Sequence, residues 1–434
     1  MDLRDLINNA NSENWPIRRR FLGGALWNVA GTALGRALYL GGLILAARLL
    51  GRDDYGRLWA VYSMVLYFGT LAGGGFGVAA AKLVAELRSL SPEKAGAAAG
   101  RLLSAVTLLG LAAAALLWAS AGWVAEKLLS APDLAGTLRL SAVLFPLAAV
   151  QAAQAGVLTG TESFRQLATA SAAQGASFVF LAAWLAGTLG LPGAILAMAA
   201  SGLAVCALQQ SLVLKELSRF GIRLALSVPG GHSPRILRPA LTLSLAGLAT
   251  AAAFWATNGM LASRPGGFGE MGLVNMGMQW MNAVLFMPTL LAMIGLPIMA
   301  ERRSAGDAGG VRAALGLNLA LAGLLALLAA GAVAGGGRLI LGFYGPEFAG
   351  GRPVLSVMAL AGFVSALSLP ACNRLLAEGR LGRYLFLNLA WAAALVTAFA
   401  LMAGRGALGL AWAHLAAGLV FLAGTWAGTR GKMK

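Results

Sequence analysis

Apolar runs of about 20 residues recur along almost the whole chain, and a helix needs a run of that length to cross a bilayer. Only 11% of the 434 residues are charged and the mean hydropathy is +0.76, whereas ordinary soluble domains have about 25% charged residues. The runs lack the alternating pattern of membrane-barrel strands, so we expect helices. The sequence therefore predicts an all-α polytopic membrane protein.

Segmenting by these runs gives twelve predicted transmembrane helices in two sets of six. The first set covers 21–47, 57–81, 102–121, 140–159, 168–189 and 193–214. The second covers 239–262, 271–299, 313–333, 353–371, 384–403 and 407–428. We therefore expect a first six-helix lobe at 21–214, a basic linker at 215–238 and a second lobe at 239–428, with tails at 1–20 and 429–434.

Basic residues are distributed unevenly between the loops. If the N-terminus is cytosolic and the helices alternate in direction, 23 of the 33 Lys and Arg residues fall on the cytosolic side and 9 on the outer side. Lys and Arg accumulate in cytosolic loops of membrane proteins. The bias predicts that both termini are cytosolic, and it accounts for the net charge of +17 without a nucleic-acid partner. The polar segment 1–20 lacks a small-residue cleavage pattern, so we interpret it as a tail and not a signal peptide.

The two halves resemble each other at a nearly constant offset, about half the chain length. "LGRDDYGRLWAVYSM" precedes the second run and "GGFGEMGLVNMGMQW" precedes the eighth, and "LTGTESFRQLA" has a counterpart in "LAEGRLGRYLF". "LGLPGAI" and "AGRGALG" form matching turns before the sixth and twelfth runs. These matches predict a duplicated six-helix unit, and an even-numbered unit repeats in the same orientation. Transporters built from such parallel repeats place the substrate between the halves.

Arg36 is the single charge inside the first apolar run, and burying arginine at mid-membrane costs about 2.5–3.5 kcal/mol on insertion scales. All sixteen carboxylates fall in tails, loops or run ends. A cationic interior without acids suits an anionic substrate, and guanidinium binds phosphate in a bidentate manner. We therefore expect Arg36 to face a water-filled cavity; a structural pairing with backbone carbonyls or with Asp53 or Asp54 is the alternative.

Further polar residues in the predicted helices are candidates to line that cavity. Asn28 lies two turns before Arg36, and amides recur at helical spacing on the fourth and eighth helices: Gln151, Gln154, Asn275, Gln279 and Asn282. Amides also join helices inside membranes, so helix–helix contact is the alternative for each. Arg101, Arg264 and Arg374 lie near helix ends, where they either attract a head group at the cavity mouth or extend to the membrane surface as anchors.

Glycine and proline mark two segments that could deform. Gly73, Gly74 and Gly75 are consecutive in the second helix, and Pro288 and Pro297 both follow the amides of the eighth. Glycine clusters permit close helix packing, and prolines break helical hydrogen bonds. We expect these residues either to pack helices closely or to act as hinges.

The sequence offers no motif of a catalytic or metal site. Cys206 and Cys372 are far apart in apolar surroundings, and His232 and His414 are isolated. GxSxG, P-loop and HExxH motifs are absent from the sequence. We therefore predict a protein that is not an enzyme, with buried structural thiols and neither a metal nor a cofactor.

The segment "ARLLGRDDYGRLWAVYSM" resembles the R-x-L-G-x-x-x-Y-G segment of polysaccharide-biosynthesis transporters, the O-antigen-type flippases of the multidrug/oligosaccharidyl-lipid/polysaccharide exporter superfamily. Arg48, Leu50, Gly51, Tyr55 and Gly56 account for the match. "GGGFGVAAAKLVAE", "GVLTGTESF" and "RLLAEGRLGRY" resemble segments that follow in the same family. The resemblance covers both halves, although the related lipid II flippases commonly have fourteen helices.

The resemblance implies two six-helix lobes around a basic cavity that opens alternately to each side of a bacterial inner membrane. It implies export of an undecaprenyl-pyrophosphate-linked glycan, with membrane lipids, a glycan polymerase and chain-length proteins as further partners. Three alternatives remain from the sequence, and one of them is a non-transporting scaffold. A drug or cation exporter would need an acid in the cavity, and a membrane-embedded glycan polymerase would need clustered acidic or metal-binding residues.

Overall fold

The computed structural model is helical throughout, without a strand among the residues it describes. It describes the backbone of 3–88, 91–224, 234–304 and 306–430. It describes the side chains of the same residues except those in 3–30, 66–75, 78, 234–241, 243–244, 293–294, 296–297, 300, 304, 308 and 428–430. Eight stretches in the described part are long and apolar enough to cross a membrane, and the chain is therefore a multi-pass membrane protein.

The first half of the chain contains α1 to α6. Its α-helices are α1 (Leu3–Leu87), α2 (Pro92–Trp123), α3 (Ala135–Ser141), α4 (Leu144–Gly160), α5 (Phe164–Leu181) and α6 (Gly187–Arg219). Short π- and 3₁₀-helices lie at η1 (Val124–Leu128), η2 (Pro132–Leu134) and η3 (Ala182–Ala186). Helix α1 thus begins well before the expected start of the first membrane helix at residue 21.

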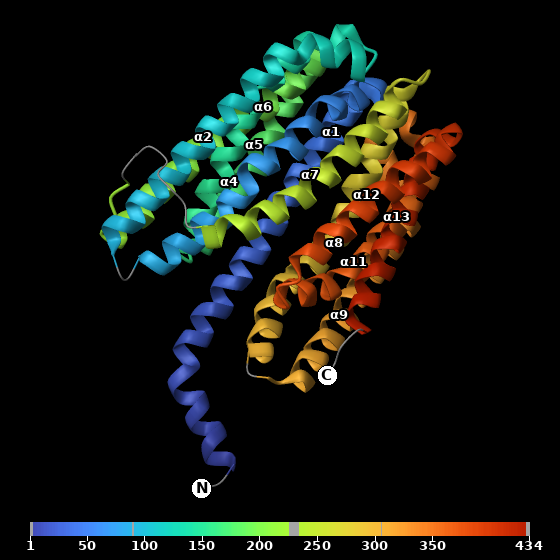
Figure 1. Cartoon of the computed structure of the whole chain (residues 1–434). Coiled ribbons are helices and arrows are strands. Elements are labelled where there is room, and N and C mark those ends of the chain that lie inside the picture. The colour runs from blue at the N-terminus through green and yellow to red at the C-terminus, as the bar shows by residue number, and fades with distance from the viewer. Residues whose placement is uncertain (1–2, 89–90, 225–233, 305, 431–434) are drawn as a thin grey trace.

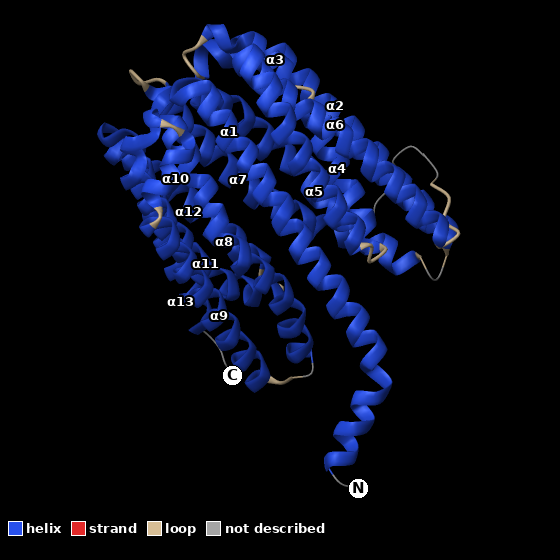
Figure 2. Cartoon of the chain, turned by 180° about the vertical axis from the view of Figure 1, so that it is seen from behind, coloured by secondary structure: helices blue, strands red, loops and turns tan. Residues whose placement is uncertain are grey.

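The second half contains α7 to α13. Its α-helices are α7 (Pro234–Ala262), α8 (Gly267–Ser304), α9 (Ala308–Gly335), α10 (Gly337–Tyr344), α11 (Arg352–Ala377), α12 (Leu381–Met402) and α13 (Gly406–Arg430). The 3₁₀ turns η4 (Pro346–Gly351) and η5 (Ala403–Arg405) connect them. Figures 1 and 2 show each half as a group of long, roughly aligned helices.

Two of the long helices contain a sharp reversal of the chain. In α1, Gly51 has φ 76° and ψ 174°, and in α6, Gly190 has φ 61° and ψ −136°. Glycine lacks the Cβ that penalises positive φ, so it can turn the chain within a continuous run of helical residues. Two of the eight membrane-length stretches, Gly31–Val65 and Phe164–Arg219, each contain one of these glycines and continue on both sides of it.

Residues with positive φ recur in the second half at almost the same position as in the first. Gly51 is followed 215 residues later by Gly266, Ser130 by Gly345 at the same offset, Glu162 by Gly379 after 217, and Gly190 by Gly406 after 216. Gly406 has φ 57° and ψ −133°, close to the values of Gly190. The backbone therefore repeats its turns at the offset found in the sequence.

The two halves contact each other through α1, which packs against α7 and α8. Within the first half α1 also packs on α4 and α5, and within the second α8 packs on α9 and α11. The largest cluster of buried apolar side chains includes residues of both halves, such as Tyr55, Trp59, Met271 and Val274. In Figure 1 the two groups lie side by side at the upper end, and they lie farther apart at the lower end, where N and C are marked. We call these the Gly51 end and the terminal end.

Candidate transport site between the two halves

Arg36 lies on α1 at the face that meets the second half. Its guanidinium carbon is 4.9 Å from the ring centroid of Phe286 on α8. A cation over an aromatic face is attracted by about 0.5–2 kcal/mol, more when water is excluded. The Arg36 side chain is exposed in the protein, and no carboxylate among the described residues forms an ion pair with it. The arrangement therefore presents an uncompensated cation at the boundary between the halves.

Two of the three amides on α8 belong to a polar cluster that also joins the halves. Gln279 Nε2 donates to the hydroxyl of Tyr55 on α1 and to Asn275 Oδ1 at 3.1 Å. The Tyr344 hydroxyl donates to Gln279 Oε1 at 3.0 Å. Tyr55, Tyr344 and Asn275 are all buried. These amides thus contact the other half directly, whereas Asn282 is exposed.

Gln151 and Gln154 are brought together, but within the first half. Gln151 Nε2 donates to Gly202 O at 2.7 Å, and Gln154 Nε2 donates to Gln210 Oε1 at 2.9 Å. Both acceptors lie on α6, so the pair joins α4 to α6. Such bonds are worth about 0.6 kcal/mol each in membrane proteins.

Arg52 forms an ionic contact between the halves at the Gly51 end, and sequence reasoning did not identify it. Its backbone N–H donates to Glu347 Oε2 at 2.7 Å, and its guanidinium lies 3.4 Å from Glu270 Oε1. Glu270 Oε2 also accepts the N–H of Ala407 at 2.7 Å, at the start of α13. The available signal was that Arg52 in "LGRDDYG" and Glu270 in the matching segment "GGFGEMG" are opposite in charge.

Glycines let α1 and α8 approach closely beside this contact. A Cβ on Gly56 would collide with the carbonyl oxygen of Phe268, and one on Gly272 would collide with that of Arg52. Only glycine permits two backbones to come this near. The Gly51 end is therefore closed by backbone packing as well as by charge.

The three arginines predicted at the cavity mouths lie in different surroundings. Arg374 is buried near the terminal end of α11, where its Nε donates to Glu378 Oε1 at 3.0 Å. Arg264 is half-buried, and its Nη1 has no partner among the described residues. Arg101 is half-buried on α2.

Glu378 gathers three arginines at the terminal end. Besides Arg374, Arg303 lies 3.3 Å and Arg380 3.4 Å from its oxygens. Partial burial opposes ionisation, but the hydrogen bond and charge of Arg374, with the neighbouring arginines, hold the pKa of Glu378 below its ordinary value. The cluster has a net positive charge.

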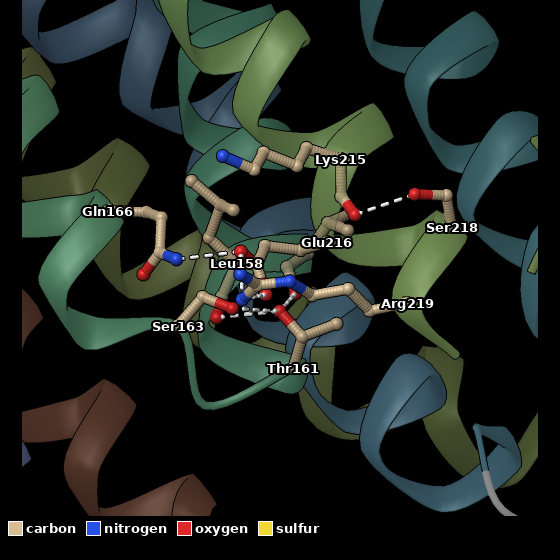
Figure 3. A network of polar contacts seen from close by, with 9 residues as sticks. Leu158, Thr161, Ser163, Gln166, Lys215, Glu216, Ser218 and Arg219 are labelled. Carbon is tan, nitrogen blue, oxygen red and sulfur yellow. Dashed lines mark hydrogen bonds and ion pairs between the residues drawn. The ribbon is translucent and has the colours of Figure 1, made fainter. Parts of the chain in front are cut away.

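The first half contains an equivalent ion pair. Arg88 and Glu162 are joined at 2.5 Å, and they precede Arg303 and Glu378 by 215 and 216 residues. A further carboxylate, Glu216, is buried nearby and accepts hydrogen bonds from Gln166 at 2.7 Å and from Arg219 at 2.9 Å (Figure 3). At the terminal end, each half therefore has glutamates that form ion pairs with arginines.

The predicted hinge residues are only partly described. Helix α8 continues through Pro288, which is buried. The side-chain surroundings of Asn28, Gly73, Gly74, Gly75 and Pro297 lie outside what the structure describes, although all five belong to helices.

The fold is similar to that of solved transporters. A structure described as the inward-facing conformation of a multidrug resistance MATE family transporter of the MOP superfamily has a TM-score of 0.74 at 14% identity, covering 94% of this chain and 98% of that one. An outward-facing MATE structure has a TM-score of 0.69 at 13% identity, covering 94% of each chain. A MOP superfamily transporter from Pyrococcus furiosus, described as having reversed polarity of its binding pocket, has a TM-score of 0.68 at 13% identity, covering 93% and 92%. The class of protein is therefore a helical membrane protein with the MATE-like transporter fold.

The sequence comparisons narrow this class. The sequence model of the family described as polysaccharide biosynthesis protein matches residues 21–302, and the chain belongs to that family. A relative, the EPS I polysaccharide export inner membrane protein EpsE of Ralstonia solanacearum, is 25% identical over 422 residues, covering 93% of this chain and 92% of the relative. The resemblance inferred from the short segments around Gly51 and Tyr55 is confirmed.

Proposed function

We propose that the chain moves a lipid-linked, pyrophosphate-bearing glycan from the inner to the outer leaflet of a bacterial inner membrane. The observation that carries this proposal is Arg36: a guanidinium without a carboxylate partner among the described residues, at the boundary between two packed halves. The planar guanidinium donates to two phosphate oxygens at once, and a pyrophosphate offers several such pairs of oxygens. Membership of the polysaccharide biosynthesis family and the likeness to a polysaccharide export protein support a glycan substrate.

We propose an alternating-access cycle between two six-helix lobes with both termini cytosolic. The kinks at Gly51 and Gly190 divide the long helices so that twelve membrane crossings result, and the recurrence of positive-φ residues at offsets of 215–217 supports a parallel repeat. In this orientation the Gly51 end is the outer end. Its contacts between Arg52 and Glu270 and between Tyr55 and Gln279 belong to a state closed to the outside.

The proposed roles of the other residues follow from their positions. Asn282 is exposed on α8 and contacts the sugar, while Asn275 and Gln279 hold the outer end closed. Gln151 and Gln154 maintain the first lobe. The arginines Arg101, Arg264 and Arg374 attract the anionic head group at the mouths. We further propose Asn28 as a cavity residue, the glycines 73–75 with Pro288 and Pro297 as hinges, and a glycan polymerase and chain-length proteins as partners.

The test is a pair of substitutions, Arg36→Ala and Arg36→Lys, in a cell whose surface glycan depends on this protein. Arg36→Ala should abolish surface glycan at normal protein level, and Arg36→Lys should retain part of it, because lysine keeps the charge without the bidentate geometry. Arg165→Ala, which removes an exposed arginine at a helix start, is the control and should leave glycan unchanged. Normal glycan in Arg36→Ala cells would contradict the proposal.

The MATE-like fold makes drug export the competing function. A cation exporter relies on a carboxylate to bind its substrate or coupling ion. Ethidium efflux from cells that express the protein separates the two functions. Efflux that survives Arg36→Ala, together with unaltered surface glycan, would favour the exporter.

A further inference from the structure

A cavity of about 240 Å³ lies within the second half, and residues of α7, α8, α11, α12 and α13 form its wall. Pockets that hold drug-sized ligands measure about 300–1,000 Å³, so this cavity suits a smaller molecule. Its wall carries hydroxyl and amide groups, and these are Thr250, Thr289, Ser365, Ser368 and Asn388. It also carries the aromatic side chains of Trp391 and Phe421.

The polar groups of the wall offer mainly hydrogen-bond acceptors. The hydroxyls of Thr250 and Thr289 donate to carbonyl oxygens one turn earlier on their own helices, at 3.1 and 2.8 Å. Ser368 does the same at 3.4 Å, and Asn388 Nδ2 donates to the carbonyl oxygen of Tyr384 at 2.8 Å. A hydroxyl oxygen that donates its hydrogen keeps its lone pairs, and so does the amide oxygen of Asn388. The wall therefore suits a ligand that has several O–H groups.

The ligand that fits this wall is neutral. None of the described residues that line the cavity is charged. A cation in this space would lose its hydration without gaining a counter-charge, and such a transfer is costly. A molecule with neutral hydroxyl groups meets no such penalty, because each O–H exchanges water for an acceptor on the wall.

Trp391 gives the cavity a fixed aromatic surface. Its ring packs against Phe254 at 5.5 Å and against His414 at 6.4 Å between centroids, and neither partner is among the described residues that line the cavity. The face of an aromatic ring is negative, so it attracts the weakly positive C–H groups of a sugar ring. Sugars combine O–H groups at the ring edge with C–H groups on the ring face. The acceptors and the aromatic surface together therefore match a sugar ring.

The cavity lies next to the proposed phosphate site. Thr289 is exposed, and it shares a face of α8 with Asn282, which is also exposed, and with Phe286. Phe286 is the residue whose ring faces the Arg36 guanidinium of the other half. Thr289 follows Phe286 by three residues, which is about one turn or 5 Å along the helix. A sugar attached directly to a phosphate at Arg36 therefore reaches the cavity.

The cavity also lies on the side from which a substrate can enter. Along α8, Thr289 is farther than Phe286 from the Gly51 end and nearer to Arg303, which lies at the terminal end. The two groups of helices lie farther apart at the terminal end (Figure 1). The contacts that join the halves around Arg52 and Tyr55 are at the opposite end.

We propose that this cavity is a sugar-binding subsite, which holds the sugar attached directly to the pyrophosphate while Arg36 holds the phosphate. The proposal rests on the proposed function and adds the residues that recognise the sugar. Thr250, Thr289 and Asn388 accept hydrogen bonds from its hydroxyl groups, and Trp391 packs on its ring. These residues set which sugars the protein accepts.

Binding is measured by isothermal titration calorimetry on the purified protein, in a detergent whose head group is neither a sugar nor a phosphate. The probes are inorganic phosphate and the 1-phosphates of glucose, galactose and N-acetylglucosamine. At least one sugar phosphate should bind about tenfold or more tightly than inorganic phosphate, because the sugar adds several hydrogen bonds. Equal affinity for all four probes would overturn the sugar subsite.

Two substitutions of similar size remove acceptors from the wall, and they are Thr289→Val and Asn388→Leu. Each should weaken the sugar phosphate by about two- to tenfold and leave inorganic phosphate unchanged. The matched control is Thr397→Val on α12: Thr397 is also exposed and donates to the carbonyl one turn earlier at 2.8 Å, but it is not among the lining residues. Thr397→Val should bind all probes as the wild type does. A preference for the sugar phosphate that persists in both cavity variants would overturn the proposal.

The same variants separate this proposal from the proposed function in cells whose surface glycan depends on the protein. The double variant Thr289→Val with Asn388→Leu should lower surface glycan at normal protein level, and Thr397→Val should leave it unchanged. Normal glycan in the double variant would reject the sugar subsite and leave the proposed function intact. Normal glycan in Arg36→Ala cells would instead reject the proposed function.

Discussion

The Arg52 guanidinium lies 3.4 Å from Glu270 Oε1, and this ion pair joins the first half of the chain to the second. Both side chains are about one-third exposed, at 33% and 32%. Exposed ion pairs of this kind are worth about 0.2–1 kcal/mol. In the proposed alternating-access cycle, a contact of this strength is enough to bias the equilibrium between two conformations and weak enough to break in each cycle.

Arg52→Ala should shift the population toward a state that is open at the Gly51 end. A loss of about 0.2–1 kcal/mol corresponds to a shift of up to about fivefold. Pulsed electron paramagnetic resonance would check this shift by measuring the distance between spin labels placed on the two halves at that end. The charge exchange Arg52→Glu with Glu270→Arg should restore the wild-type distribution. A distribution that is the same in wild type and Arg52→Ala would mean that the pair does not hold the halves together.

Gly56→Ala should prevent the two halves from packing closely at the same end, because the added methyl group has no room there. The added methyl would collide with the carbonyl oxygen of Phe268 on α8, so the halves must separate locally. The matched control is Gly41→Ala, also in α1, where an added methyl meets no atom within 4 Å. Alanine there should be neutral or should stabilise the helix by up to about 1 kcal/mol. Accessibility of an introduced cysteine near Tyr55 to a thiol reagent would rise in Gly56→Ala and stay unchanged in Gly41→Ala.

Tyr344→Phe should destabilise the cluster around Gln279, because Gln279 Oε1 loses the hydroxyl that donates to it at 3.0 Å. A buried acceptor left unpaired costs about 1–3 kcal/mol. Gln279→Leu removes the acceptor as well, so the double variant should lose less stability than the two single variants together. Thermal unfolding in detergent measures all three. Additive losses would show that the two side chains do not interact.

Acid should weaken the arginine cluster around Glu378. Its pKa is lower in the folded protein than the ordinary value of 4.5, so the ionised form favours folding. This contribution is complete above about pH 4.5 and is lost as the pH falls through the lower folded pKa. The unfolding temperature of the wild type should therefore drop over that interval, and that of Glu378→Gln should start lower and drop less. The control Glu86→Gln, an exposed carboxylate beside Lys82, should follow the wild type. Parallel curves for Glu378→Gln and the wild type would contradict this role.

The sequence was sufficient to predict features that depend on local chemistry. Apolar length predicted membrane helices, and the segments near Gly51, Glu162 and Gly190 revealed the repeat at which positive-φ residues recur. Arg36 was recognisable because a lone charge in an apolar run has few stable environments. These signals are contained within single helices or in loops of similar sequence.

Side-chain pairing between distant helices could not be predicted in the same way. Periodicity puts Asn275 and Gln279 on one face of α8, but it does not say which helix that face meets, and Tyr55 is more than two hundred positions away. Glu270 was likewise visible only as a carboxylate at a helix start. Partners of this kind follow from the packing of two whole halves, which a single sequence does not specify.

Glu270 retains a role when the halves separate. Its Oε2 accepts the backbone N–H of Ala407 in the first turn of α13, which belongs to the same half. The carboxylate therefore keeps a hydrogen bond when it separates from Arg52. Arg52, for its part, can be hydrated at the membrane surface. Separation therefore exchanges one favourable environment for another. In the proposed transport cycle, the halves can accordingly separate at this contact by thermal motion, without ATP hydrolysis in each cycle.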